Sequence, residues 1–161
     1  MNPRFRAAKE SDASLLLQFM RQYYAFDGHA FDEPKARAAL LNFLRDSTLG
    51  LAWLIYDEST PVGYIVLTLG YSLEFLGRDA FIDEFFLIES HRSRGWGRKA
   101  MEFAEDYARS QGVRAIHLEV VHSNRSALEV YRKLGFCDHE HHLMTKWIEP
   151  EFAKPGAGPG H

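Results

Sequence analysis

The sequence predicts a single α/β domain, of the α+β kind, with helices on both faces of a mixed and mostly antiparallel sheet. The length of 161 residues, 46% of them hydrophobic, is typical of one domain. Segments with strand character first form a hairpin, and strands then alternate with helices. This order favours an antiparallel half that continues into strand–helix–strand units.

The first part of the chain is predicted to contain a short strand and two helices. The strand covers Arg4 to Ala7, and a polar residue at position 11 or 12 can cap the helix that follows. The segment from Tyr24 to Phe31 contains a glycine and is predicted to be a loop. Asp32 and Pro34 are typical of the beginning of a second helix.

The middle of the chain changes to the pattern of strands. Leu51 to Tyr56 and Val62 to Leu69 read as two strands joined by a short turn, so they predict an antiparallel hairpin. We expect a loop from Gly70 to Asp79 and a further strand from Ala80 to Ile88.

The second half alternates helices with strands. A helix is predicted from Gly97 to Gln111, since Gly112 directly after it is a natural C-cap. A buried strand from Ile116 to Val121, a helix from Ser126 to Leu134 and a last strand from Leu143 to Ile148 complete the prediction.

Composition excludes several classes of protein. The net charge of −3 argues against a nucleic-acid partner, because such proteins usually carry a basic excess. No apolar run reaches the roughly 18–20 residues of a membrane span, so no membrane partner is expected. The first residues lack an apolar signal core, which predicts a cytoplasmic protein.

Metal and disulfide chemistry are not expected either. Cys137 is a lone cysteine, which excludes an internal disulfide and a cysteine-based zinc site, and we expect it to be a small buried residue. His139 and His141 would share one strand face, but no third ligand is evident. We assign the domain to residues 1–150 and predict that residues 151–161 form a flexible Pro/Gly-rich tail.

A glycine-containing loop is the strongest functional signal. The strand ending at Ile88 is followed by Gly95 and Gly97 and then directly by a helix. Such a loop presents free backbone N–H groups and the positive end of a helix to an anion, which predicts a phosphate site. The alternative is a solvated turn with incidental glycines. The spacing matches neither a Walker loop nor a dinucleotide fingerprint.

Two motifs together resemble the GNAT superfamily of N-acetyltransferases. Arg92-x-x-Gly95-x-Gly97 is similar to its glycine-loop motif, and a second motif runs from Asn124 through Tyr131 to Gly135. They lie in the expected order on the expected elements. The resemblance implies acetyl-CoA as the acetyl donor, no metal, a small-molecule amine as acceptor and the possibility of a homodimer.

The resemblance also implies how acetyl-CoA is bound. The strands Ala80 to Ile88 and Ile116 to Val121 would splay apart to hold the pantetheine arm, and the backbone near Phe86 and Leu87 would bind the acetyl carbonyl. An N–H group there would stabilise the tetrahedral intermediate. The expected donor-binding residues are Phe86, Leu87, Arg92, Ser93, Arg94, Gly95, Trp96, Gly97, Arg98, Lys99, Asn124, Ala127 and Tyr131.

Acetyl transfer to an amine needs an acid and a base. Tyr131 matches the position of the family's tyrosine acid, and its alternative role is packing on the core. Asp83 and Glu84 are candidate bases, since adjacent carboxylates in an apolar strand are costly unless used or paired. Alternation predicts that they point to opposite faces. Pairing with Arg78 or Lys146 is the structural alternative.

Two features, Tyr71-Ser72 and an acidic pair directly before Phe85-Phe86, are similar to the polyamine and thialysine branch of the superfamily. That branch tends to show a Glu-Asp pair, whereas this chain reads Asp-Glu. Acids with aromatic side chains suit a small cationic amine or an amino-acid-like acceptor. The candidate acceptor-binding residues are Tyr24, Asp27, Tyr71, Glu74 and Glu119, the last also an alternative base. Acetylation of peptide or protein N-termini and a non-catalytic acyl-CoA-binding sensor are the alternative functions.

Overall fold

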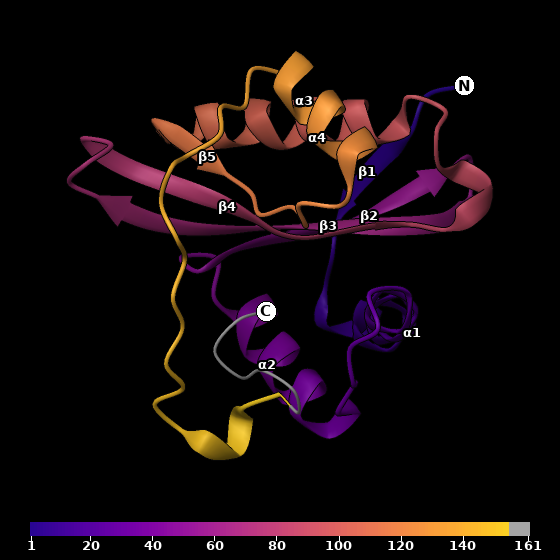
Figure 1. Ribbon diagram of the computed structural model, residues 1–161. Helices are drawn as coiled ribbons and strands as arrows, with labels where there is room; N and C mark the ends of the chain where they lie inside the picture. Colours follow the sequence, from indigo (N-terminus) through magenta and orange to yellow (C-terminus); the bar gives the residue numbers. More distant parts are fainter. Residues whose placement is uncertain (155–161) are drawn as a thin grey trace.

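The computed structural model describes residues 1–154 and is built around a five-stranded sheet with the order β1-β2-β3-β4-β5 (Figure 1). The first four strands pair antiparallel, and β5 pairs parallel to β4, so the predicted mixed and mostly antiparallel sheet is confirmed. The strands are β1 (Arg4–Ala7), β2 (Gly50–Asp57), β3 (Thr60–Ser72), β4 (Gly77–Leu87) and β5 (Ala115–His117).

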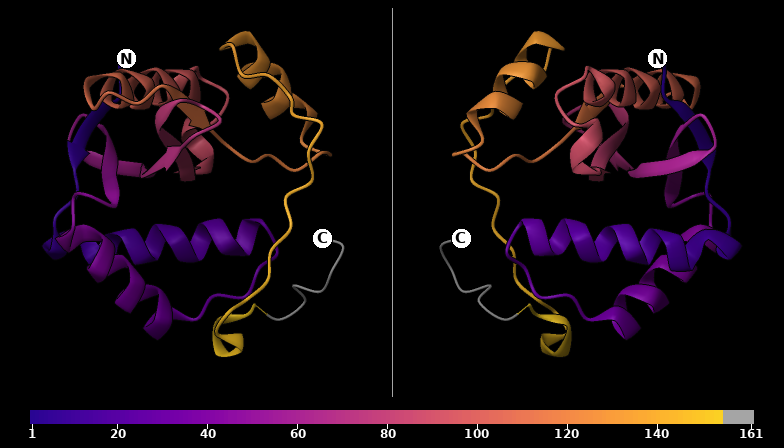
Figure 2. Two further views of the ribbon diagram at one scale, coloured as in Figure 1. Left: turned by 90° about the vertical axis from the view of Figure 1, so that its left-hand side faces the viewer. Right: turned by 90° about the vertical axis from the view of Figure 1, so that its right-hand side faces the viewer.

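Helices cover both faces of this sheet. The helices α1 (Ala13–Phe26) and α2 (Glu33–Arg45) lie against one face, whereas α3 (Trp96–Ser110) and α4 (Arg125–Lys133) lie on the other (Figures 1 and 2). A separate apolar core fills each side. This three-layer arrangement confirms the predicted fold class.

The central strand β3 shows why the sheet has two apolar faces. Its residues alternate between the two cores, so that Ile65 and Leu67 pack on the α3 side whereas Tyr64 and Val66 pack on the α1 side. All four are buried because helices cover both faces. The hairpin of β2 and β3 is therefore fixed in register by both cores.

Two predicted loops are shorter in the structure. The ladder between β3 and β4 continues to the pair Ser72 and Gly77, so most of the predicted loop from Gly70 to Asp79 is strand. Backbone pairing extends here beyond the apolar core, where side-chain pattern gives no signal for it. Similarly, α1 continues to Phe26 and includes the beginning of the predicted loop from Tyr24 to Phe31.

The predictions for the last strands are corrected. Strand β5 has only three residues, and the predicted strand from Leu143 to Ile148 does not form. Its side chains are exposed, Met144 at 90%, in an extended segment that runs from α4 past the sheet to the level of α2 (Figure 2). Strand propensity reflects packing on a neighbour, and this segment has none within residues 1–154. Cys137 lies in the same segment and is exposed, not buried as predicted.

The C-terminal part of the described chain returns to the helix layer. A short 3-10 turn, η3 (Pro150–Phe152), lies near α2, where Lys35 Nζ donates to the Glu151 carbonyl oxygen at 2.6 Å. The predicted flexible tail thus begins with residues in contact with α2, and its remainder, 155–161, lies outside the described residues. Within residues 1–154, no helix is both long and apolar enough to cross a bilayer.

Candidate active site

The loop between β4 and α3 has the backbone shape of an anion site. Gly95 is the N-cap of α3 and has a φ of 77°, and Ser93 also has a positive φ of 58°. A Cβ atom on Gly95 would meet nothing within 4 Å, so glycine is favoured there by its conformation and not by lack of space. The first N–H groups of α3 have no partners inside the helix, which is the feature that binds phosphate.

The basic side chains of this loop are mostly engaged with the protein itself. Arg92 Nε donates to the Leu87 carbonyl oxygen at 2.8 Å, and its guanidinium lies over the Phe86 ring. Arg98 pairs with Glu102 at 2.8 Å, and Lys99 Nζ donates to Asn2 at 2.5 Å, whereas Arg94 is exposed. The Trp96 side chain is buried, so only its backbone is available to a ligand.

The strand β5 covers only the first part of the edge of β4. They pair only at Asp79 with Ala115, Ala80 with Ile116 and Phe81 with His117. Beyond Phe81, β4 continues to Leu87, but no strand pairs with it on that side in the part of the chain described. Backbone groups along this edge need partners, and an extended ligand can provide them. The ladder ends because β5 itself ends at His117, so the predicted splay of a longer strand, Ile116 to Val121, away from β4 stays a prediction.

A β-bulge lies where β4 leaves β5. In the ladder with β3, Val66 pairs with Glu84, but the next residue, Leu67, pairs with Ile82, so Asp83 is the extra residue. A bulge interrupts the alternation of side chains. Asp83 and Glu84 therefore both line one pocket, which corrects the prediction that they point to opposite faces.

We call this pocket the acidic pocket. It has a volume of about 260 Å³ and lies between the C-terminal end of α1 and β4, on the α1 side of the sheet. Its lining residues are Tyr23, Tyr24, Asp27, His29, Asp83, Glu84 and Lys154. The pocket thus combines three carboxyl groups with two phenol rings.

The predicted acceptor residues are only partly brought together. Tyr24 and Asp27 line the acidic pocket. Tyr71 is exposed. It lies five residues along β3 from Val66, the ladder partner of Glu84, and five residues of strand span about 17 Å. Glu74, in the exposed turn after β3, and Glu119, exposed after β5, also lie outside the pocket lining.

Glu84 is the best-supported carboxylate of the pocket. Tyr24 donates its hydroxyl hydrogen to Glu84 Oε2 at 2.6 Å, and Tyr64 donates to Oε1 at 3.1 Å. Burial raises the pKa of Glu84, and the two hydrogen bonds partly offset the increase. A carboxyl group with a raised pKa in a cleft is a candidate proton acceptor.

Asp83 has a different environment. Burial of the carboxyl group raises the pKa of Asp83, and the charge of Lys154 opposes the increase. The residue as a whole remains exposed at the surface. We therefore give Glu84 the greater weight as a base and regard Asp83 as a charge at the pocket rim.

Tyr64 was not predicted from the sequence. It is fully buried in β3 on the α1 side, and its hydroxyl reaches Glu84 across the ladder. A signal existed, since a buried tyrosine usually needs a hydrogen-bond partner for its hydroxyl. The neighbouring acidic strand could have been searched for that partner.

Tyr131 lies on the other face of the sheet. It is half-buried on α4 and packs against the core on the α3 side. Its ring lies edge-on to the ring of Phe136, with 5.9 Å between the two centroids. Burial raises its pKa, so the phenol is protonated at neutral pH. At the start of the same helix, Asn124 Oδ1 accepts a hydrogen bond from the Ala127 N–H at 3.3 Å and caps α4. Tyr131 and Glu84 thus belong to opposite sides of the sheet.

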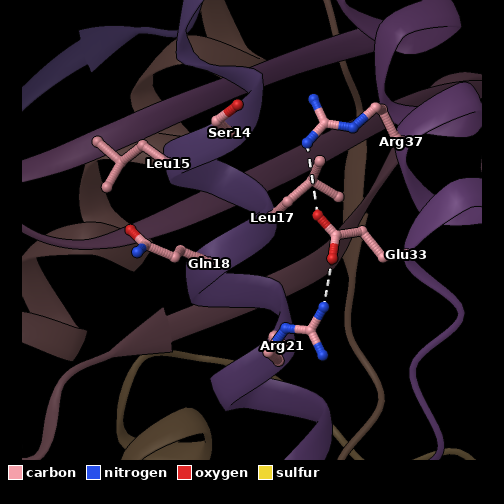
Figure 3. A pocket seen from close by; sticks show the side chains of 7 residues that line it. All are labelled: Ser14, Leu15, Leu17, Gln18, Arg21, Glu33 and Arg37. Atoms are coloured by element: carbon pink, nitrogen blue, oxygen red, sulfur yellow. Dashed lines mark hydrogen bonds and ion pairs between the residues drawn. The ribbon is translucent and has the colours of Figure 1, made fainter.

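A second pocket, of about 390 Å³, lies between α1 and α2 (Figure 3). Its carboxylate, Glu33, bridges Arg21 and Arg37, as the dashed lines show. An incoming ammonium group would therefore meet a carboxylate that already has two cationic partners. The carboxyl groups of the acidic pocket, in contrast, form no ion pair with arginine in the part of the chain described.

Comparison with known proteins identifies the family of this chain. The model of the acetyltransferase (GNAT) family matches residues 16–136, so the chain belongs to that family. It is an acetyl-CoA-dependent N-acetyltransferase, and the resemblance found in the two sequence motifs is confirmed.

Individual relatives extend this comparison. The uncharacterized N-acetyltransferase YhfO of Bacillus subtilis is 29% identical over 132 residues, covering 81% of this chain and 87% of the relative. The thialysine N-epsilon-acetyltransferase of Mus musculus is 24% identical over 149 residues, covering 84% of each chain.

Solved structures share the fold. An integron cassette protein from the mobile metagenome of the Cole Harbour salt marsh has a TM-score of 0.80 and 32% identity, with 91% of each chain covered. A predicted acetyltransferase from Clostridium acetobutylicum, determined with acetyl-CoA, has a TM-score of 0.76 and 18% identity, covering 89% of this chain and 96% of that chain.

Proposed function

We propose that the acceptor of this N-acetyltransferase is the primary amine of a small cationic molecule and that it binds in the acidic pocket. The observation that carries the proposal is that Asp83 and Glu84 line the same pocket, together with two phenol rings. Carboxylates attract an ammonium group, and aromatic faces add cation–π attraction. The name of the thialysine enzyme, which specifies an ε-amine, supports an acceptor of this kind.

The donor binds on the other side of β4 in this proposal. The backbone N–H groups from Ser93 to Gly97 bind the pyrophosphate, and the gap between β4 and β5 accommodates the pantetheine arm. Support comes from the positive φ values in the loop and from the early end of the β4–β5 ladder. A free N–H near Phe86 or Leu87 then donates to the acetyl oxygen, where negative charge develops.

Glu84 and Tyr131 divide the proton transfers between them. Glu84 takes a proton from the ammonium group, directly or through one water, and the neutral amine attacks the thioester carbonyl. A C–N bond forms and the C–S bond breaks, and Tyr131 gives its hydroxyl proton to the departing sulfur. The nitrogen of the intermediate loses its second proton to water as the neutral amide forms. Glu84 then releases its proton to solvent, and the Tyr131 phenolate takes one from solvent. The location of Tyr131 and Glu84 on opposite sides of the sheet supports this division, because the reacting carbonyl must lie between the amine and the thiol.

Thiol release from acetyl-CoA with a panel of amines tests the proposal. The panel contains 1,4-diaminobutane, spermidine, lysine, an aminoglycoside and peptides with free N-termini. We expect turnover with the small flexible cations and little with peptides, since the carboxyl groups and phenol rings of the pocket suit an alkylammonium group. Turnover of the peptides alone would contradict the proposal.

A further inference from the structure

The C-terminal arm, residues 149–154, brings a lysine into the acidic pocket. Lys154 lines the pocket together with Asp83 and Glu84, and its Nζ lies 4.5 Å from the centroid of the Tyr24 ring. It is the only lysine or arginine among the described residues of the lining. The pocket proposed to bind an ammonium group therefore already contains one from its own chain.

Lys154 has the chemistry of the proposed acceptor. The end of its side chain is a primary ammonium on a flexible chain of methylenes, and its charge lowers the pKa of Asp83 and of Glu84. Its position over the Tyr24 ring is the cation–π arrangement expected for an alkylammonium ligand. The carboxylates and the Tyr24 ring would bind a free alkylamine by the same charge and cation–π attractions that hold the Lys154 side chain.

The arm is held to the body by few contacts. Lys35 Nζ donates to the Glu151 carbonyl oxygen and lies 5.5 Å from the centroid of the Phe152 ring. Phe152 is 49% exposed, so its ring is only partly packed. With so few contacts between the arm and α2, we expect the loss of either one to weaken the attachment of the arm.

We propose that Lys154 is an internal occupant of the acceptor subsite, so that the C-terminal arm competes with the amine substrate for the acidic pocket. This inference rests on the proposed function of that pocket. An occupied subsite lowers the fraction of molecules competent to bind the acceptor, and the apparent affinity for the acceptor falls by that fraction. The turnover number is unaffected, because a bound acceptor has already displaced the arm.

Steady-state kinetics with 1,4-diaminobutane at saturating acetyl-CoA test the competition. If the arm fills the pocket in about four of five molecules, Lys154→Met lowers KM for the diamine roughly fivefold and leaves kcat within about twofold. Lys146→Met is the matched control, because it removes the same charge from an exposed position upstream. An unchanged KM in Lys154→Met would overturn the proposal.

A second variant separates competition from a simple change of charge. Phe152→Ala leaves Lys154 and the net charge in place but removes a ring that holds the arm near Lys35. Release of the arm lowers KM in this variant too. A lower KM in Lys154→Met with no change in Phe152→Ala would show an electrostatic effect alone and would also overturn the proposal.

An NMR measurement follows the arm without turnover. In protein labelled with ¹³C at the ε-carbon of its six lysines, the Lys154 signal is identified by its loss in Lys154→Met. The ring current of Tyr24 shifts this signal upfield, and added 1,4-diaminobutane returns it toward the position of a free lysine. A Lys154 signal at the free position from the start would contradict occupancy. Absence of turnover with any amine, in wild type and variants, would count instead against the proposed function.

Discussion

At the scale of single residues, the bulge at Asp83 determines the chemistry of the site. Alternation along a regular strand would separate Asp83 and Glu84, and the sequence analysis therefore predicted only one of them in the pocket. The ladder instead skips Asp83, and both carboxyl groups reach the same volume. A bulge depends on the pairing with β3, so the sequence of β4 alone could not predict it.

The first prediction concerns Glu84 as the base. Glu84→Gln keeps the size of the side chain and removes its ability to take a proton, so kcat/KM should fall at least about tenfold, toward the 10²-fold typical of a general base. Asp83→Asn is the matched control and should mainly raise KM, since Asp83 attracts the cation. Equal and small losses in both variants would place the base elsewhere.

The pKa of Glu84 gives a second prediction, on stability. Its pKa in the folded state is raised by burial, so protonation favours the folded protein. The stabilising contribution of the protonated group is complete below the unfolded pKa and is lost as pH rises through the folded pKa. Glu84→Gln should therefore have a higher melting temperature than wild type at pH 8, and the difference should shrink near pH 4. A difference that grows toward low pH would contradict the raised pKa.

The third prediction concerns Tyr131. Tyr131→Phe retains the ring that packs on the core and removes only the hydroxyl group. If the phenol protonates the leaving thiolate, kcat should fall about 10²-fold while the dissociation constant of CoA stays near that of wild type. Turnover within about twofold of wild type would leave packing as its role.

At the scale of elements, the loop before α3 was well predicted because its signals are local. Glycines at two fixed positions after a strand and before a helix are visible in the sequence, and the structure gives Gly95 the expected left-handed conformation. The contact of Lys99 with Asn2 spans 97 residues and was not predictable from spacing, whereas the contact of Arg92 with the Leu87 carbonyl oxygen spans only five residues.

Two substitutions at Gly95 test the loop as the pyrophosphate site. Gly95→Ala introduces backbone strain of about 1–2 kcal/mol but no clash, because its Cβ would meet nothing within 4 Å. CoA should still raise its melting temperature. Gly95→Glu adds bulk and negative charge, and the CoA-induced increase should disappear. An undiminished increase in folded Gly95→Glu would contradict the assignment.

The segment from Leu143 to Ile148 shows where the sequence misled. Its apolar residues are typical of a strand, but a strand also requires a neighbour to pair with, and no local pattern reports whether one is available. The structure leaves Leu143, Met144 and Ile148 exposed. Hydrogen exchange tests this correction: amides from 143 to 148 should exchange far faster than those of β3. Strong protection there would mean that the predicted strand forms after all.

At the scale of the whole molecule, the order of helices and strands was predictable, but the contacts that bring distant segments together at the acidic pocket were not. The hairpin, the glycine loop and the helix caps are signalled by nearby residues, and they suffice to define the class of fold. The acidic pocket, in contrast, combines the end of α1, the bulge of β4 and the C-terminal arm. The arm contacts α2 over a sequence separation of 116 residues, and such a contact leaves no local pattern.

The acidic pocket as the site of the acceptor amine is the central claim, and a crystal structure with CoA and 1,4-diaminobutane tests it most directly. We predict density for the diamine in the acidic pocket, with one nitrogen within hydrogen-bond distance of Glu84 and the CoA sulfur on the other side of β4 near Tyr131. Lys154 should then have left the Tyr24 ring. Diamine density between α1 and α2, in the pocket around Glu33, with the acidic pocket still filled by Lys154, would contradict the claim.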